Sequence, residues 1–219
     1  FDSNCNTVGD WVLSKKNICR VLGLPEPAKN EIYTKLEYAC DACKGCVALI
    51  RNRAFDPYIY TSPADCIKLA DQAIGKGAQL LLTDHQIKDY PCLIVPEPFE
   101  AYQSIIAAIR RQFTGFVVGI TGSIGKTSTT GMVNAVVSSK YKTFSNLHNA
   151  NSAIYSAKLI QQLTPEYQAY VQEIMETPPY GLAGMISKMV QPQVAIITVV
   201  GTSHMKALGS QERIRETCF

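Results

Sequence analysis

Hydrophobic and polar positions in the first half of the chain alternate between short apolar runs and longer amphipathic segments. The apolar runs at 46–50, 79–83 and 92–95 predict strands, because each is short and bounded by turn-forming or polar residues. The segments 63–75 and 100–113 repeat apolar side chains at helical spacing and predict helices. This alternation of strand and helix predicts an α/β domain with a largely parallel sheet.

A second series of the same kind begins near residue 114. Strands are expected at 116–121, 142–145, 169–174 and 194–200, and helices at 126–139, 153–163 and 182–190. We therefore predict an α/β fold in two parts. A small N-terminal α/β domain covers 1–113, of which 1–39 stay unassigned. A P-loop-type central domain with a mostly parallel sheet flanked by helices covers 114–219.

A glycine-rich turn joins the first strand of the second part to its helix. It reads Thr-Gly-Ser-Ile-Gly-Lys-Thr over 121–127. Gly122 and Gly125 let the backbone turn tightly and point N–H groups inward, where the following helix presents its positive end to an anion. Lys126 can contact the outer phosphates and the Thr127 hydroxyl can bind Mg²⁺. The turn therefore indicates binding of a nucleoside triphosphate.

The turn departs from the strict P-loop pattern at one position. The first glycine of that pattern belongs at residue 120, where the chain has Ile120, and Gly119 lies one position too early. An ordinary strand–turn–helix junction with a solvated lysine is the alternative interpretation. The preceding strand, the following helix and the Gly-Lys-Thr triplet favour the phosphate-binding one.

Composition narrows the classes of function. The chain has 219 residues, of which 47% are apolar, and a net charge of +3, too small to suggest a nucleic-acid or membrane partner. No apolar stretch approaches the roughly 18–20 residues of a membrane span, and no signal peptide is visible. We expect a cytoplasmic protein, and the sequence leaves its oligomeric state open. Because the chain starts at Phe1 and stops within a helical pattern, we also expect a fragment at both ends.

The chain has eight cysteines, and three of them are evenly spaced. Cys40, Cys43 and Cys46 have the spacing of metal or iron–sulfur ligands, but Ile50 stands near the place of a fourth ligand. The others are scattered singly among apolar residues. A metal site and reduced structural thiols both stay open. The second is favoured, because a cytoplasmic nucleotide enzyme keeps its thiols reduced.

Polar side chains close three of the strands expected in the second part. The turn at 121–127 follows the first, Glu173 lies at the end of another, and His204 follows the last. Ligands of open α/β sheets bind beyond the carboxyl ends of the strands. A carboxylate and an imidazole beside a phosphate-binding turn suit Mg²⁺-assisted phosphoryl chemistry. A solvated glutamate and a structural histidine are the alternatives.

Four ordered segments carry a family resemblance: the turn at 119–130, Thr143-Phe-Ser-Asn-Leu-His-Asn149, Val171-Gln-Glu173, and the run 192–210 with Gly201-Thr-Ser-His204. They resemble the ATP loop and the following conserved motifs of the Mur ligases, which make peptidoglycan precursors. The N-terminal half is more loosely similar to that family's UDP-sugar-binding domain. Within the family, the pattern is most similar to the type that adds D-alanyl-D-alanine to a UDP-muramoyl tripeptide.

The resemblance implies an ATP-dependent amide ligase. ATP phosphorylates the carboxylate of a UDP-muramoyl-peptide-like substrate, and the amine of an amino acid or dipeptide displaces phosphate. The chain departs from the family at Pro57, His148, Ser152 and Cys218, the last standing where many members have a carbamylated lysine. We expect the family's C-terminal domain, which binds the acceptor, to lie outside this fragment, and we therefore expect the fragment to have little or no activity alone.

The resemblance also implies roles for individual residues. Thr127 and Glu173 hold the first Mg²⁺, and His204 reaches a second if one binds. Asn149 lies near the γ-phosphate and the acceptor carboxylate, and Glu176 replaces Glu173 if the strand register is shifted. The ATP-binding residues implied are Gly122, Ser123, Ile124, Gly125, Lys126, Thr127 and Ser128, with Lys126 on the β- and γ-phosphates.

Two other functions stay open. The departures above allow a Mur-like ATP-binding module with an altered acceptor or lost catalysis. An unrelated P-loop kinase or GTPase is disfavoured, because it leaves the segments at 143–210 unexplained.

Overall fold

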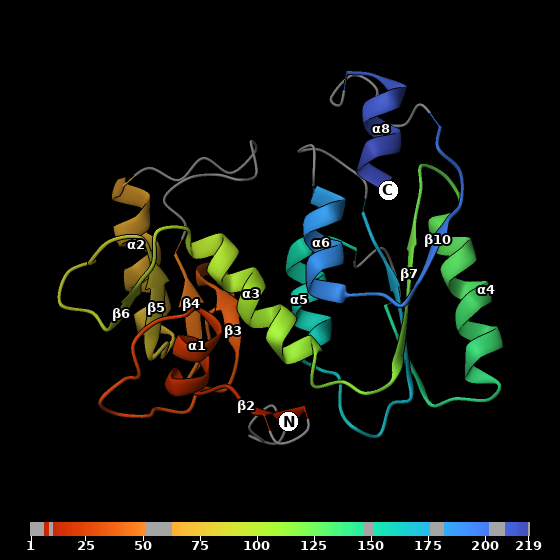
Figure 1. Ribbon diagram of the computed structural model, residues 1–219. Coiled ribbons are helices and arrows are strands. Elements are labelled where there is room, and N and C mark those ends of the chain that lie inside the picture. The colour runs from red at the N-terminus through yellow and green to blue at the C-terminus, as the bar shows by residue number, and fades with distance from the viewer. Residues whose placement is uncertain are drawn as a thin grey trace. The chain divides into compact units, whose positions relative to one another are not determined.

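The computed structural model describes residues 7–8, 11–50, 63–146, 151–175, 182–201 and 209–218. Close contacts divide the chain into two compact units, unit 1 (Phe1–Ile109) and unit 2 (Arg110–Phe219). Both are built of parallel sheets and helices (Figure 1). The α/β class predicted from the sequence is therefore confirmed. The boundary expected after residue 113 lies a few residues later than the division by contacts.

Unit 1 contains a four-stranded parallel sheet in the order β3-β4-β5-β6. The strands are β3 Leu36–Tyr38, β4 Val47–Leu49, β5 Leu80–Thr83 and β6 Cys92–Ile94. Every residue of β4 and β5 is buried, which explains why these strands read as apolar runs without alternation. The sequence pattern does not predict β3, because its short run includes a charged residue, Glu37, which is buried in the strand.

Unit 1 also contains a short antiparallel strand pair and several helices: β1 Thr7–Val8, β2 Trp11–Val12, α1 Lys15–Val21, the short helix η1 Ala39–Asp41, α2 Pro63–Gly75 and α3 Pro98–Arg110. Helix α2 buries Cys66, Ala70 and Ala73 completely, at the spacing of one helical face. These side chains pack with residues of β4 and β5 in one core cluster. The apolar stripe that predicts α2 is therefore the stripe that faces the sheet.

The described cysteines of unit 1 pack mostly as small apolar side chains. Cys46 is fully buried, and Cys43 packs against the same core cluster. The Cys43 backbone N–H donates to Cys46 Sγ at 3.3 Å, and burial raises the pKa of the Cys46 thiol to about 11. Cys40 is exposed. Within the described ranges, no three His, Cys, Asp or Glu side chains are grouped to hold a metal ion.

Unit 2 contains a second four-stranded parallel sheet, in the order β10-β7-β9-β8. The strands are β7 Phe116–Thr121, β8 Thr143–Ser145, β9 Ala169–Glu173 and β10 Val194–Ile197. Pairing sets Ile120 beside Glu173 and Thr121 beside Ile197. The carboxyl ends of β7, β9 and β10 therefore meet at one edge of the sheet.

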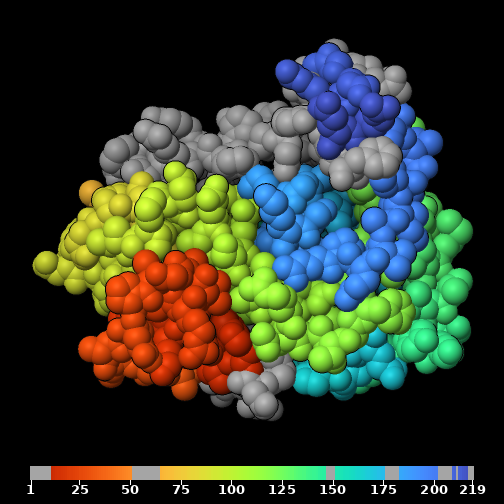
Figure 2. Space-filling view, viewed as in Figure 1, coloured from red at the N-terminus to blue at the C-terminus, as the bar shows by residue number. Residues whose placement is uncertain are grey.

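The described residues of unit 2 include four helices: α4 Lys126–Ser138, α5 Ala153–Ile160, α6 Leu182–Val190 and α8 Gln211–Cys218. Helix α4 packs against β7, β8 and β9 on one face, and α6 contacts β7 from the other and packs with α5 and α8 (Figure 1). The outer side of α4 is open to solvent (Figure 2). No helix in the described part of the chain is long and apolar enough to cross a membrane.

A buried arginine fixes the start of unit 2. Arg110 is only 3% exposed, and its guanidinium donates to the carbonyls of Phe113, Val190 and Gln191 at 2.7–3.2 Å. Burial lowers the pKa of this group. Because the last carbonyls of a helix lack partners within the helix, Arg110 satisfies backbone groups where α6 ends and the chain turns into β10.

Candidate nucleotide-binding site

The turn between β7 and α4 depends on two glycines. Gly122 has φ +125°, and a Cβ there would lie 2.3 Å from the hydroxyl of Thr198 and 3.0 Å from its backbone nitrogen. Gly125 has φ +86° and is the N-cap of α4. L-amino acids with side chains rarely adopt these dihedrals, and Gly122 has no space for one. Backbone geometry therefore requires both glycines, and close packing against Thr198 excludes a side chain at Gly122 as well.

Gly119 has a different role from these two. A Cβ at this position would lie 3.0 Å from Ile174 Cδ1 and 3.1 Å from Pro192 Cβ, so the glycine permits close packing across the sheet. Ile120, where a strict P-loop has its first glycine, is fully buried in the core of β7. The departure from the strict pattern thus belongs to the strand, and the turn itself starts at Gly122.

Hydrogen bonds from the residues after β10 hold the turn in place. The Ser123 backbone N–H donates to Val199 O at 2.7 Å, and Gly201 N donates to Ser123 Oγ at 3.1 Å. The Thr198 hydroxyl donates to Ile124 O at 2.6 Å. Because both ends of the turn continue into regular structure, these bonds fix its shape before any ligand binds.

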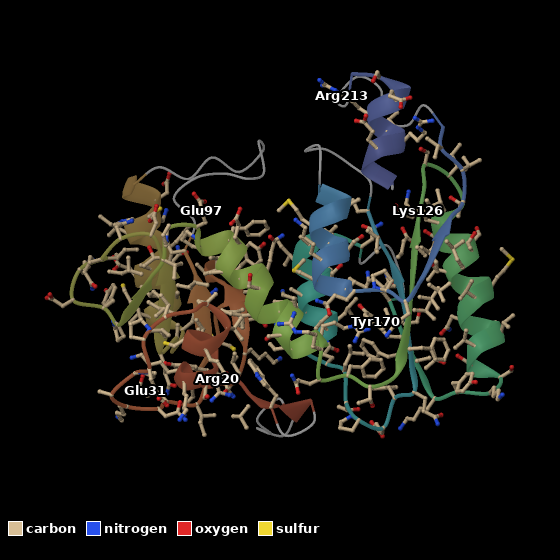
Figure 3. All side chains as sticks on the ribbon, in the orientation of Figure 1. Arg20, Glu31, Glu97, Lys126, Tyr170 and Arg213 are labelled. Carbon is tan, nitrogen blue, oxygen red and sulfur yellow. The ribbon has the colours of Figure 1, made fainter. Side chains whose placement is uncertain are left out.

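Lys126 begins helix α4 and bends back over the turn. Its Nζ donates to the Gly122 carbonyl at 2.7 Å. Figure 3 labels Lys126 at the carboxyl edge of the unit 2 sheet, whereas Tyr170 lies farther back along β9. The α4 N-terminus and the ammonium group thus place positive charge at the same edge, which suits an anionic ligand.

Glu173, at the end of β9, has a defined set of hydrogen-bond partners. Its side chain is 2% exposed, and Oε2 accepts from the Thr127 hydroxyl at 2.9 Å. Oε1 accepts from Asn151 Nδ2 at 2.7 Å, and the Glu173 backbone N–H donates to Asn146 Oδ1 at 2.7 Å. Thr127 and Glu173, predicted from sequence to share an Mg²⁺ ion, are thus in direct contact.

This donor set fits Mg²⁺. A carboxylate and a hydroxyl are oxygen ligands, and Mg²⁺ commonly binds one or two such protein groups together with phosphates and water. The Thr121 hydroxyl lies at the same edge and is buried without a hydrogen-bond partner among the described residues. A buried polar atom of this kind is consistent with an edge built for a polar ligand.

The structure brings most of the predicted site residues together, but it does not describe two of them. All seven predicted ATP-binding residues, 122–128, lie in the turn or the first residues of α4, and Glu173 lies beside them. Asn149 and His204 lie outside the described residues, as do Pro57, His148 and Glu176. The roles predicted for Asn149 and His204 therefore stay predictions.

Sequence reasoning assigned no role to three residues of this network: Asn146, Asn151 and Thr198. Asn146 and Thr198 lie inside the segments that carry the family resemblance, yet the motif alone does not show which backbone groups they bind. Asn151 lies just past its segment, directly before α5. A polar cluster after a short strand was the available signal, but it did not single out one residue.

Comparison with known families supports the family resemblance seen in the sequence. Residues 120–218 match the family described as Mur ligase middle domain. The chain is also similar to UDP-N-acetylmuramoyl-tripeptide–D-alanyl-D-alanine ligases. Identity to the Synechocystis sp. protein is 33%, over 66% of this chain and 33% of that protein. Identity to the Escherichia coli protein is 33%, over 67% of this chain and 32% of that protein. The chain thus spans about a third of the length of these relatives.

Solved structures show the same fold. The chain superposes on MurF from Acinetobacter baumannii with a TM-score of 0.74 and 22% identity, over 95% of this chain and 45% of that one. For MurF ligase from Thermotoga maritima in complex with ADP, the TM-score is 0.67 and the identity 23%, over 84% and 41% of the two chains. The likeness covers elements of both units.

Proposed function

We propose that this chain, whose residues 120–218 belong to the Mur ligase middle-domain family, supplies the ATP-binding part of an amide ligase of peptidoglycan precursor synthesis. The observation that carries the proposal is the fixed glycine turn next to the Thr127–Glu173 contact. A phosphate cradle and a pair of oxygen ligands at one sheet edge are what a kinase-like first step requires.

The turn and Lys126 bind and orient the triphosphate in this proposal. Backbone N–H groups at 124–126, at the α4 N-terminus, would bind the phosphate oxygens, while the Ser123 N–H stays bonded to Val199 O, and Lys126 would exchange its bond to Gly122 O for the β- and γ-phosphates. Because the bonds from Thr198 and Gly201 already hold the turn, little reorganisation is needed when nucleotide binds.

Thr127 and Glu173 would hold Mg²⁺, which supplies charge neutralisation at the phosphates. Glu173 is buried and its backbone N–H is bonded to Asn146, so its carboxylate is presented from a fixed point. The substrate carboxylate then attacks the γ-phosphorus and ADP leaves, and the acceptor amine attacks the acyl carbon of the acyl phosphate, loses a proton and displaces phosphate. Asn149 and His204 keep the roles predicted for them beside the γ-phosphate and a second metal ion.

The substrates are proposed from the relatives. Proteins similar to this chain are named for joining D-alanyl-D-alanine to a UDP-N-acetylmuramoyl tripeptide. We infer a UDP-muramoyl-peptide-like substrate, bound with the help of unit 1, and an amino acid or dipeptide acceptor. A cytoplasmic location follows from these substrates. Residues 1–219 alone are expected to show little or no ligase activity.

Phosphate release by the full-length protein tests the function. It should require ATP, Mg²⁺, a UDP-muramoyl tripeptide and D-alanyl-D-alanine together, and Lys126→Ala should reduce it at least about 100-fold, or by roughly 2.7 kcal/mol in transition-state stabilisation. Lys140→Ala, at an exposed lysine beyond the other end of α4, is the matched control and should leave the rate unchanged. Release that ignores either substrate would refute the ligase. Tight Mg²⁺·ATP binding without any turnover would instead support a binding module that has lost catalysis.

A further inference from the structure

Asn151 contacts the candidate metal ligand directly although no motif assigned it a role. We propose that Asn151 is a positioning residue, which orients the Glu173 carboxylate and thereby sets the affinity of the nucleotide site for Mg²⁺. This inference rests on the proposed function, because it concerns the same site.

The two carboxylate oxygens of Glu173 have different partners. Oε1 accepts from Asn151 Nδ2 at 2.7 Å, whereas Oε2 accepts from the Thr127 hydroxyl at 2.9 Å. Thr127 follows Lys126 in the nucleotide-binding turn, so Oε2 is the oxygen on the phosphate side. Asn151 holds the other oxygen and so determines the rotation of the carboxylate plane.

Asn151 is itself held by the end of β9. Its backbone carbonyl accepts from Met175 N at 3.2 Å, and its side-chain amide donates to Glu173, which precedes Met175 by two residues. Ser152, the next residue, is the N-cap of α5. The amide is therefore anchored from both sides, and its direction relative to the carboxylate is fixed by regular structure.

The arrangement has a specific consequence for a cation. An ionised carboxylate has about four acceptor positions, and a neutral amide N–H occupies one of them without cancelling the charge. Mg²⁺ demands near-ideal octahedral geometry, so a carboxylate free to rotate binds it less well. Hydrogen bonds to ligating carboxylates typically change metal affinity by about 10–100-fold.

A second possibility is that Asn151 only stabilises the fold. That role would lower the melting temperature of a variant and leave its Mg²⁺ dependence unchanged. The positioning role moves the Mg²⁺ dependence while nucleotide binding without metal stays the same. The two roles are therefore separated by measuring ADP binding across a series of Mg²⁺ concentrations.

The test uses Asn151→Leu, which keeps approximate size and removes the donor, with Asn151→Ala as a second variant in case leucine does not fit. Asn134→Leu, at an asparagine within α4 whose side chain bonds only to Ser138 in the described structure, is the matched control. Calorimetric titration of the purified protein with ADP gives the Mg²⁺ concentration that half-maximally enhances binding. We expect this midpoint to rise about 10-fold or more in either Asn151 variant and to stay at the wild-type value in Asn134→Leu.

The outcomes separate this inference from the proposed function. Asn151 variants with the wild-type Mg²⁺ midpoint would overturn the positioning role, even if their melting temperature falls. If wild-type protein binds ADP without any help from Mg²⁺, or if Lys126→Ala binds it as well as wild type, the nucleotide site itself is wrong and both proposals fail.

Discussion

The two parallel sheets of this chain have the same number of strands but different chemistry at their carboxyl ends. In unit 1, β5 ends at Thr83, which is fully buried and whose hydroxyl has no hydrogen-bond partner among the described residues. In unit 2, β7 likewise ends at a buried threonine hydroxyl without a partner among the described residues, Thr121, but the neighbouring β9 ends at Glu173, whose two carboxylate oxygens each accept a hydrogen bond. Similar layers therefore support different sites.

The difference lies in the residues that follow the strands. After β7 the chain makes a turn that only glycine permits at Gly122, and residues after β10 fix it from the side. After β5 the chain continues into Asp84 and His85, which pair with each other at 2.5 Å on the surface. The comparison shows that the parallel sheet provides an edge, and that local turn chemistry decides what that edge can bind.

We expect Gly122→Ala to have the largest effect on the site at the edge of the unit 2 sheet. The new Cβ would overlap Thr198 Oγ1, and φ +125° is strained for alanine, so the turn must move. We expect a loss of about 1–3 kcal/mol in unfolding free energy and loss of detectable Mg²⁺·ADP binding. Chemical denaturation and calorimetry measure the two effects.

Gly131→Ala, inside α4 with open space around its Cβ, is the control for that variant. It should raise the unfolding free energy by about 0.5–1 kcal/mol and leave nucleotide binding intact. If the Gly122→Ala protein bound Mg²⁺·ADP as tightly as wild type, the turn would not form the nucleotide site.

Thr83→Val tests the corresponding strand end in unit 1, at the carboxyl end of β5. A buried hydroxyl without a partner costs about 1–3 kcal/mol, so replacing it with a methyl group should stabilise the protein by about 1 kcal/mol. Binding of Mg²⁺·ADP should not change. Denaturation that shows a loss of stability instead would mean that the Thr83 hydroxyl has a partner in the folded protein.

A smaller effect concerns pH and the core of unit 1. Burial raises the pKa of Cys46 from its ordinary value of 9.0 to about 11, so the folded state keeps this proton where the unfolded state loses it. The Cys46 contribution to stability is therefore complete below pH 9 and is lost as pH rises from about 9 to about 11. Cys46→Ala should be less stable overall and should lack this part of the pH dependence in denaturation at pH 8, 9 and 10. If the unfolding free energy of wild type and of Cys46→Ala fell equally between pH 8 and 10, the raised pKa of Cys46 would be contradicted.

The sequence predicted the strands and helices around the site because their patterns are strong. The apolar run of β7, the glycine turn and the start of α4 follow directly from residue types. The contact between Thr127 and Glu173 could be expected from the rule that ligands bind at carboxyl strand ends. Spacing and residue type were sufficient there.

Other features could not be predicted, for physical reasons. Strand β3 contains a buried glutamate, so its burial depends on tertiary packing and not on its own pattern. The side-chain bonds of Asn151 and Thr198 join residues 22 and 74 positions apart, and only the folded sheet shows that they meet. The use of Gly119 for packing likewise depends on Ile174 and Pro192, which arrive from elsewhere in the chain.

The central claim is that Thr127 and Glu173 act on one Mg²⁺ ion at the nucleotide-binding turn. A double-mutant cycle with Thr127→Val, Glu173→Gln and the combined variant, scored by the Mg²⁺-dependent part of ADP binding, tests it most directly. Two ligands of one ion act together, so each single variant should lose most of that part and the combined variant should lose little more. Losses that add independently, or single variants that keep the wild-type Mg²⁺ dependence, would contradict it.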